Sequence, residues 1–169
     1  MSLPMIVSHH RWQQIRVLAM DVDGILTDGT IQVGENLGER KTFSVLDGLG
    51  MAMIREAGIP TAWVSGRHSS ATIQRAGELV ISHVLQDRKD KKEALQELAR
   101  QEGWKPEEIC YLGDDIIDIP ALEWVGIGVS VPNALPEVKL HADWITDRPG
   151  GAGAVRDVCN RILANRRQK

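Results

Sequence analysis

Short apolar runs alternate with longer amphipathic segments from one end of the chain to the other. The apolar runs have the length of strands and carry few polar residues, a pattern typical of strands buried on both faces of a sheet. In the longer segments, apolar residues recur three and four positions apart, as they do in amphipathic helices. The alternation predicts an α/β fold with a Rossmann-like parallel sheet flanked by helices. The expected strands are residues 15–20, 61–64, 83–85, 109–112, 127–129 and 143–145, and the expected helices are residues 47–56, 69–79, 90–100 and a last one around 155–163.

One segment interrupts this alternation. Residues 28–33 and 39–43 flank a centre rich in turn-forming residues at 34–38. We expect a β-hairpin that projects from the domain. The other intervals between the expected strands are already filled by helices, so the sequence leaves no room for a cap domain.

The composition is that of an ordinary globular protein. The 169 residues are 43% hydrophobic and 25% charged, with a formal net charge of -3. We expect a single domain spanning residues 1–169. The slightly acidic balance, with only 5 Trp, 1 Tyr and 1 Phe, gives no reason to expect a nucleic-acid partner.

Cysteine usage and hydropathy bear on location. Cys110 and Cys159 are too few for a disulfide framework and lie in apolar patterns, which is typical of buried thiols in a reducing compartment. No uninterrupted apolar run is long enough to span a membrane, so no membrane partner is expected. We expect a cytoplasmic protein.

Two groups of aspartates follow expected strands. Asp21 and Asp23 come directly after the first strand, and Asp114, Asp115 and Asp118 come after the fourth. Because the carboxyl ends of parallel strands form the ligand crevice of an open sheet, both groups fall on one edge. A single aspartate in such a loop often only caps the next helix. A whole group near one edge is different, since two like charges about 4 Å apart repel by about 4 kcal/mol at an effective dielectric of about 20.

A cation would relieve this repulsion. Carboxylate and carbonyl oxygens suit a hard ion, and a site that keeps waters and accepts a substrate phosphate suits Mg²⁺. The same edge receives two more polar groups, because Ser65 follows the second strand and Lys91 begins the helix after the third. The sequence therefore predicts a magnesium site with a hydroxyl and an ammonium beside it.

Four short motifs in this order are similar to those of a known family. They are Asp21-Val22-Asp23-Gly24, Ser65-Gly66-Arg67, Asp90-Lys91 and Gly113-Asp114-Asp115-Ile116-Ile117-Asp118. The sequence resembles the haloacid dehalogenase superfamily of phosphatases in its capless form. Within that superfamily it resembles the bacterial 3-deoxy-D-manno-octulosonate-8-phosphate phosphatases and the related phosphatases of sialic-acid-type sugars.

The resemblance implies a mechanism. Asp21 is expected to be the nucleophile that takes the phosphoryl group, and Asp23 to protonate the leaving alkoxide and then to activate water. Mg²⁺ is expected to be held by the Asp21 carboxylate, the Asp23 backbone carbonyl and Asp114. Ser65 and Lys91 are expected to hold the transferring oxygens, and Lys91 also to fix Asp21.

The resemblance also implies supporting roles. Asp115 and Asp118 are expected to orient the metal site. Lys91 stands in a run of charges, and Lys89 and Lys92 are alternatives to it, although the Asp90-Lys91 pair matches the family pattern. The glycine-rich stretch 150–153 before the last helix is either an anion-binding nest or a closely packed turn.

The expected substrate is a small sugar-acid phosphate, 3-deoxy-D-manno-octulosonate 8-phosphate, a compound of lipopolysaccharide precursor synthesis. Arg67 and Arg75 lie on the segment that leaves the Ser65 strand end, where a guanidinium can bind a substrate carboxylate through two hydrogen bonds. Gly66 is expected to contact the substrate beside them. Nonulosonic acid 9-phosphates are the alternative substrates, although the phosphatases that act on them tend to carry an acidic residue where Arg67 stands.

Two other functions use similar residues. A response-regulator receiver domain also combines carboxylates, a hydroxyl, a lysine and Mg²⁺, but its phosphoacceptor aspartate follows a middle strand, whereas the second strand here ends at Ser65. A binding module without activity is the other alternative, although no motif residue has been lost. A cysteine phosphatase is excluded, because Ile116 and Asn165 stand where its arginine would be required.

We expect a homo-oligomer, a tetramer, in which neighbouring chains complete each site. Without a cap domain, the exclusion of water and the grip on the far end of the substrate have to come from elsewhere. A projecting hairpin exposes strand edges that pairing with other copies would cover. The resemblance implies such an assembly with C-terminal tails that reach the neighbouring site. This chain ends in the basic stretch 166–169 without an apolar tail, so only the hairpin contacts are expected.

Overall fold

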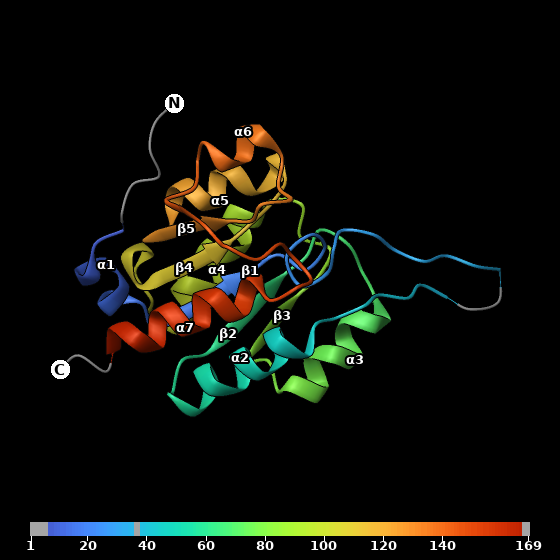
Figure 1. Cartoon of the computed structure of the whole chain (residues 1–169), viewed down its shortest axis with the longest axis horizontal. Coiled ribbons are helices and arrows are strands. Elements are labelled where there is room, and N and C mark those ends of the chain that lie inside the picture. Colours follow the sequence, from blue (N-terminus) through green and yellow to red (C-terminus); the bar gives the residue numbers. More distant parts are fainter. Residues whose placement is uncertain (1–6, 36–37, 167–169) are drawn as a thin grey trace.

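A parallel sheet of six strands forms the centre of the molecule in the computed structural model, which describes residues 7–35 and 38–166. The strand order is β3-β2-β1-β4-β5-β6 (Figure 1). The chain runs outward from β1 to one edge and then returns to β4 on the other side of β1, so the strand order reverses there and opens a crevice at the strand ends. The strands are β1 (Val17–Met20), β2 (Thr61–Val64), β3 (His83–Leu85), β4 (Ile109–Leu112), β5 (Ile127–Ser130) and β6 (Trp144–Ile145).

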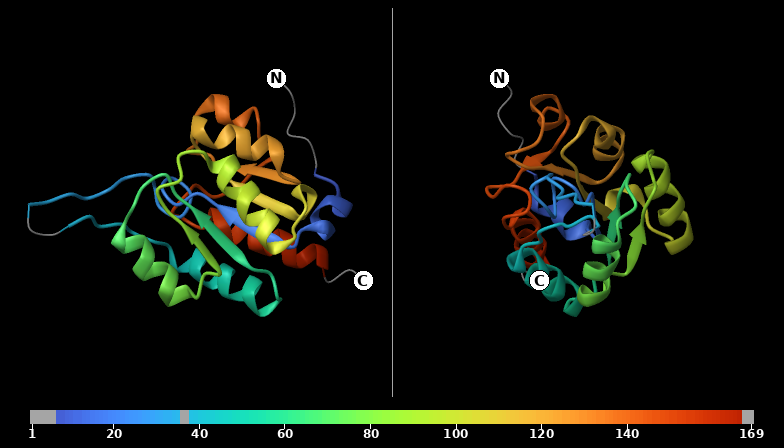
Figure 2. Two further views of the ribbon diagram at one scale, coloured as in Figure 1. Left: turned by 180° about the vertical axis from the view of Figure 1, so that it is seen from behind. Right: turned by 90° about the vertical axis from the view of Figure 1, so that its right-hand side faces the viewer.

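Helices cover both faces of the sheet (Figure 2). Successive residues of β1 point to opposite faces, so Leu18 and Met20 lie in one apolar cluster and Val17 and Ala19 in the other. The first cluster is closed by α1 (His9–Gln14), α2 (Val45–Glu56), α3 (Ser70–Leu79) and α7 (Ala154–Arg166). The second is closed by α4 (Lys91–Glu102), α5 (Ile119–Trp124) and α6 (Pro136–Lys139). Two short 3₁₀ turns, η1 (Pro106–Glu108) and η2 (Ile116–Asp118), flank β4.

The predicted architecture is confirmed, and β2, β3 and β4 have the predicted bounds. The first strand begins at Val17 and not at residue 15, because Ile15 is the C-cap of α1 and its backbone N–H donates to Trp12. The helices α1, α5 and α6 were not predicted. They have 6, 6 and 4 residues, which is too short for a helical period to be visible in the sequence.

Side-chain caps fix where two helices begin near the crevice. The Asp90 carboxylate accepts the backbone N–H of Glu93 at 2.8 Å and so starts α4 at Lys91. The Ser69 hydroxyl accepts the backbone N–H of Thr72 at 3.5 Å at the start of α3. The cap on α4 matters for the site, because it places Lys91 in the first turn, beside the strand ends.

The predicted hairpin is a projecting ribbon with one antiparallel pair. Residues 28–35 and 38–43 form two arms that extend away from the sheet (Figures 1 and 2). Gln32 and Arg40 exchange backbone hydrogen bonds of 3.2 and 3.0 Å, and no further pair joins the described parts of the arms. The pairing is limited to this bridge, because an isolated two-stranded ribbon gains little from pairing. Residues 36–37 of the predicted turn lie outside the described residues.

Two features bear on the expected cellular setting. Cys110 in β4 and Cys159 in α7 are free and buried, as predicted. Burial raises the pKa of both thiols, so they remain protonated and unreactive. Within residues 7–35 and 38–166, no helix has the length and apolar character needed to cross a membrane.

Candidate active site

Asp21 lies at the end of β1, where the strand order reverses. Its backbone N–H donates to the Leu112 carbonyl at 3.0 Å, which holds the residue in line with the neighbouring strand β4. The Oδ1 atom accepts the backbone N–H of Val22 at 2.6 Å, and Oδ2 lies 3.0 Å from the Lys91 ammonium. Burial raises the pKa of Asp21 to about 7, although Lys91 opposes this shift. The Asp21 carboxylate is thus fixed in position, close to a cation, and largely shielded from solvent.

Lys91 is the lysine that reaches the strand ends. It is only 1% exposed, and its Nζ atom lies 3.0 Å from Asp21 Oδ2 and 3.1 Å from Asp118 Oδ1. Burial lowers the pKa of Lys91, but the Asp21 and Asp118 carboxylates outweigh burial and raise it above its ordinary value. Lys89 is exposed and Lys92 half-buried, and neither lines the cleft. Lys91 is therefore a positive charge in the site, and of the three lysines that the sequence offered it is the one whose ammonium lies against Asp21.

Asp118 organises its neighbours. It is fully buried, and its Oδ1 atom accepts the Tyr111 hydroxyl at 2.6 Å and the Lys91 ammonium at 3.1 Å. Its Oδ2 atom accepts the backbone N–H groups of Asp114 and Asp115, both at 3.1 Å. Both oxygens of Asp118 are thus saturated by donors from the strand end, the helix start and the loop. This geometry suits the predicted orienting role.

Asp115 is exposed at the rim of the site. Its Oδ1 atom accepts the backbone N–H of Ile116 at 2.7 Å and begins the turn η2. The side chain lines the cleft, but its hydrogen bond serves the local turn. Its backbone N–H, donated to Asp118, is what ties it to the centre of the site.

Asp114 projects toward Asp21 from the loop after β4. Its Oδ1 atom is buried and has no hydrogen-bond partner among the described residues. Burial raises the pKa of Asp114 to about 8, and the charges of Asp21 and Asp118 add to the shift. Gly24 makes room for this side chain, because a Cβ at Gly24 would lie 1.9 Å from Asp114 Oδ2, and its φ of +88° is one that side chains rarely adopt.

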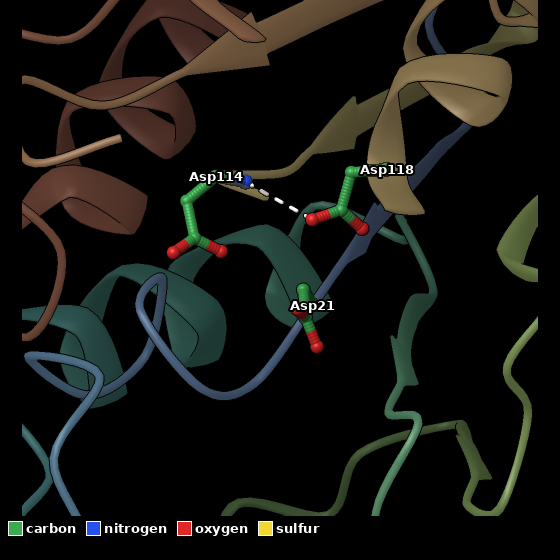
Figure 3. A group of neighbouring side chains, drawn as sticks. All are labelled: Asp21, Asp114 and Asp118. Atoms are coloured by element: carbon green, nitrogen blue, oxygen red, sulfur yellow. Dashed lines mark hydrogen bonds between the residues drawn. The ribbon is translucent and has the colours of Figure 1, made fainter. Parts of the chain in front are cut away.

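The three buried or half-buried carboxylates fit a divalent cation. One oxygen from each of Asp21, Asp114 and Asp118 lies within 4.8 Å of the other two (Figure 3). The unpaired Oδ1 of Asp114 and the raised pKa of both Asp21 and Asp114 reflect crowded, buried carboxylates, whose repulsion a divalent cation would relieve. Each oxygen of Asp118 already accepts two hydrogen bonds, whereas each oxygen of Asp21 has one partner and Oδ1 of Asp114 has none among the described residues. Asp21 and Asp114 are therefore the side chains that would hold Mg²⁺.

Ser65 and Gly66 form the opposite wall of the site. Ser65 follows β2, is buried, and its hydroxyl accepts the backbone N–H of Arg67 at 3.2 Å. A cleft of about 210 Å³ opens between this wall and the aspartates. Its lining contains the predicted Asp21, Asp23, Ser65, Gly66, Arg67, Lys91, Asp114 and Asp115, together with Gly29 and Ile117.

Asp23 lies in the cleft beside Asp21 and meets two cations. Its Oδ1 atom is 2.7 Å from the ammonium of Lys41, and its Oδ2 atom is 3.9 Å from Nε of Arg67. Lys41 belongs to the projecting ribbon, and sequence reasoning did not single it out. A lysine among the polar residues of a turn-rich segment gives no sign of where its ammonium will lie.

Glu39 joins the ribbon to the site. Its Oε2 atom is 2.5 Å from Arg67 Nη2, and its Oε1 atom is 3.5 Å from Lys41 Nζ. Burial would raise the pKa of Glu39, but a hydrogen bond from Ser69, the contact with Arg67 and the charge of Lys41 outweigh it and lower the pKa. Glu39 is therefore a carboxylate that holds both cations. Sequence reasoning missed it for the same reason as Lys41.

Arg75 does not line the cleft of the described chain. Its guanidinium pairs with Glu78 at 3.0 Å on α3 and packs over Gly48 of α2, where a Cβ would lie 2.7 Å from Arg75 Nη2. Arg67, by contrast, lines the cleft with a half-exposed side chain. Of the two arginines expected to bind the substrate carboxylate, only Arg67 stands at the site within one chain.

The glycine-rich stretch 150–153 is a closely packed turn whose helix start is already capped. The Asp47 carboxylate of α2 accepts the backbone N–H of Arg156 at 2.9 Å, in the first turn of α7. A Cβ at Gly150 would lie 1.8 Å from the Gly24 carbonyl oxygen. The stretch therefore supports the loop that carries Asp23, and an internal carboxylate occupies the donors that an anion nest would offer.

Comparisons with known proteins agree with this geometry. Residues 67–156 match the family model of haloacid dehalogenase-like hydrolases. The chain is 40% identical over 151 residues to the 3-deoxy-D-manno-octulosonate 8-phosphate phosphatase KdsC of Escherichia coli, an alignment that covers 89% of this chain and 80% of the relative.

Two solved structures are similar over nearly the whole chain. The 3-deoxy-D-manno-octulosonate 8-phosphate phosphatase of Moraxella catarrhalis, in complex with magnesium, phosphate and KDO, has a TM-score of 0.92 and 41% identity, covering 94% of this chain and 91% of its own. The cobalt-bound deoxy-D-mannose-octulosonate 8-phosphate phosphatase of Haemophilus influenzae has a TM-score of 0.89 and 34% identity, covering 94% of this chain and 92% of its own.

Proposed function

Because the chain belongs to the haloacid dehalogenase-like hydrolases, we propose that it is a Mg²⁺-dependent phosphatase of 3-deoxy-D-manno-octulosonate 8-phosphate. The observation that carries the proposal is the buried contact between Asp21 and Lys91 beside Asp114, in a chain that is 41% identical to a phosphatase bound to magnesium, phosphate and KDO. A receiver domain would carry its phosphoacceptor aspartate after a middle strand, where this chain has Ser65, and a binding module without activity would not need this complete set of groups. We assign the sugar-acid phosphate to lipopolysaccharide precursor synthesis.

In the first half of the proposed reaction, a carboxylate oxygen of Asp21 attacks the phosphorus. The bond between phosphorus and the sugar oxygen breaks as an aspartyl-phosphate forms. Asp23 gives its proton to the leaving sugar oxygen, so the sugar acid departs as a neutral alcohol at that position. Lys91 holds Asp21 in place from one side, and Ser65, which lines the cleft, donates its hydroxyl proton to an oxygen of the phosphoryl group.

In the second half, water attacks the phosphorus of the aspartyl-phosphate. Asp23, now a carboxylate, takes a proton from that water, and the bond to Asp21 breaks to release inorganic phosphate. Mg²⁺, held by Asp21, Asp114 and the backbone carbonyl of Asp23, would supply the positive charge that lets an anionic nucleophile meet an anionic phosphate. Asp118 would hold Lys91 and the Asp114 backbone in position during both steps. Asp115, at the rim, would help to orient the metal site.

Arg67 is proposed to bind the substrate carboxylate, with Gly66 allowing close approach beside it. Its side chain is 52% exposed and lines the cleft, so it can turn toward a ligand. Arg75 is proposed to act only where another chain brings it near a cleft. We keep the nonulosonic acid 9-phosphates as competing substrates to be tested, since they share the carboxylate.

A screen of sugar phosphates with Mg²⁺ and with EDTA tests the substrate. We expect turnover only with the metal, and at least a tenfold higher kcat/KM for 3-deoxy-D-manno-octulosonate 8-phosphate than for sugar phosphates without a carboxylate, about the worth of one charge-assisted hydrogen bond. Arg67→Met should remove this preference, while Arg40→Met on the exposed ribbon surface should retain it. Equal turnover of neutral sugar phosphates by the wild type would refute the carboxylate contact.

A homotetramer in the cytoplasm is proposed as the working form. The cleft of about 210 Å³ is smaller than ordinary ligand pockets of about 300–1,000 Å³, so one chain covers the phosphoryl group and leaves the rest of the sugar acid open. Ile31, Val33, Val45 and Leu49 expose apolar side chains on the ribbon and on α2, which contacts between copies would cover. The cytoplasm would keep the thiols of Cys110 and Cys159 reduced.

Light scattering tests the assembly. We expect four times the 18.7 kDa of one chain, and a smaller species for Val33→Asp, with reduced activity. Leu140→Asp, at an equally exposed position on the far side of the sheet, is the matched control and should keep the wild-type mass. A fully active wild-type monomer would exclude shared sites. Residues 167–169 lie outside the described residues, and deletion of residues 166–169 should change kcat/KM only a few-fold.

A further inference from the structure

We propose that Lys41, carried by the projecting ribbon, is a positioning residue for the acid Asp23. The proposal rests on the function assigned above and adds a part of the machinery that lies outside the four motifs. The Nζ atom of Lys41 lies 2.7 Å from Asp23 Oδ1, and the Lys41 side chain is 0% exposed. Removing an ammonium from water costs a large desolvation free energy, which nearby carboxylates can offset.

The charge partners of Lys41 are the carboxylates of Asp23 and Glu39. Asp23 Oδ1, Glu39 Oε1 and Lys41 Nζ are buried and have no hydrogen-bond partner among the described residues. Lys41 lies 2.7 Å from the first oxygen and 3.5 Å from the second, so these carboxylates are its charge partners. Glu39 is in turn held by Arg67 at 2.5 Å. The ribbon is thereby connected to two of the loops that line the cleft, the one that carries Asp23 and the one that carries Arg67.

Lys41 acts on Asp23 and not on the substrate. Asp23 lines the cleft, whereas Lys41 does not, so the ammonium meets the carboxyl from outside the substrate space. The positive charge of the ammonium, 2.7 Å from Oδ1, favours the unprotonated form of that oxygen. The transferable proton of Asp23 would then sit on Oδ2, whose nearest cation, Nε of Arg67, is more distant at 3.9 Å. Lys41 thus selects the working oxygen of the acid.

The sequence spacing of the returning arm explains how Lys41 arrives there. Glu39, Lys41 and Phe43 alternate with outward residues, and all three contact the domain, whereas Arg40 between them is exposed. Phe43 stacks on the buried Trp63 of β2 with ring centroids 6.3 Å apart. This aromatic contact anchors the arm two residues beyond Lys41, so the register that buries Phe43 also delivers the ammonium to Asp23.

The test compares two leaving groups. An alkyl phosphate such as 3-deoxy-D-manno-octulosonate 8-phosphate needs a proton on its leaving oxygen, whereas p-nitrophenolate leaves without one. Acid catalysis contributes typically about 10²–10⁴-fold. We expect Lys41→Met to lower kcat/KM for the alkyl ester at least about tenfold more than kcat/KM for p-nitrophenyl phosphate, and Lys41→Arg to restore most of the difference. Arg40→Met, its exposed neighbour on the same arm, should lower neither value beyond twofold.

A double-mutant cycle makes the assignment specific. If Lys41 works through Asp23, then in an Asp23→Asn background the further change Lys41→Met should alter kcat/KM for the alkyl ester less than twofold. Equal losses for both substrates in Lys41→Met, or a full additional loss in the Asp23→Asn background, would overturn the proposal. The proposed function fails separately, if the wild type turns over neither ester with Mg²⁺. Should the octulosonate ester alone fail, any alkyl phosphate that the wild type hydrolyses serves for the comparison.

Discussion

The Nζ atom of Lys91 lies 3.0 Å from Oδ2 of Asp21, and both side chains are buried. The contact joins the end of β1 to the start of α4, two elements far apart in sequence. The same ammonium reaches Asp118 at 3.1 Å, so one cation stands between two carboxylates. Its removal would leave both buried and facing one another without a countercharge.

Lys91→Met should therefore damage stability and activity together. Removing one partner of a buried ion pair costs about 3–5 kcal/mol, and losing a group that stabilises charge in the transition state costs about 10²–10³ in kcat. Denaturant unfolding and steady-state kinetics measure the two effects. The matched control is Lys89→Met, an exposed lysine two positions away, which should change stability by less than about 0.5 kcal/mol. If Lys89→Met were inactive and Lys91→Met retained activity, Lys91 would not be the lysine of the active site.

Gly24→Ala should weaken Mg²⁺ binding although no charged residue is substituted. The new Cβ would lie 1.9 Å from Asp114 Oδ2, so Asp114 has to move away from Asp21. We expect the Mg²⁺ concentration for half-maximal activity to rise at least about tenfold, in line with the loss of a positioned ligand. Gly58→Ala is the control, because Gly58 has a similar positive φ of +74° but open space around it. Its backbone strain costs about 1–2 kcal/mol and should leave the Mg²⁺ titration unchanged.

The stability of the metal-free protein should fall as pH rises. Burial raises the pKa of Asp114 to about 8 and that of Asp21 to about 7, from an ordinary value of 3.8. Between these values the folded chain binds more protons than the unfolded chain, so the free energy of unfolding decreases from about pH 4 to about pH 8. Asp114→Asn should flatten this decrease. Thermal unfolding in EDTA at several pH values measures it, and a wild-type slope that the variant shares in full would contradict the raised pKa.

Mg²⁺ should reverse this loss, most strongly at high pH, because it binds the ionised carboxylates. At a metal concentration of about 100 times Kd, mass action adds about 2.7 kcal/mol. For a chain of this length that corresponds to a rise in Tm of about 5–10 °C. A rise of the same size in Asp114→Asn would remove Asp114 from the metal site.

Much of the fold could be predicted from the sequence, because β2, β3 and β4 are mostly apolar and are followed by turn-forming or polar residues. The site could be predicted as far as it lies directly after strands. Asp21, Ser65 and Asp114 occupy such positions, and the parallel sheet alone brings them to one edge. Lys91 was favoured over its neighbouring lysines because the Asp90-Lys91 pair resembles the family pattern.

The remaining residues could not be predicted, because their roles depend on distant contacts. Tyr111 alternates along β4 like any apolar strand residue, and only the fold shows that its hydroxyl meets Asp118. Lys41 reaches Asp23 because Phe43 packs on Trp63, a contact between the ribbon and the sheet that no local pattern encodes. The sequence could not decide whether residues 150–153 form an anion-binding nest or a packed turn, because Asp47, which caps the following helix, comes from another helix.

The turnover of Asp21→Asn with Mg²⁺ and 3-deoxy-D-manno-octulosonate 8-phosphate tests the central claim most directly. The substitution keeps the size of the side chain and removes the oxygen nucleophile, so an aspartyl-phosphate can no longer form. Circular dichroism should show the wild-type fold. We predict that kcat falls below about one hundredth of the wild-type value, the deficit expected from losing covalent catalysis. A folded Asp21→Asn that retains more than this would contradict the assignment of Asp21 as the nucleophile.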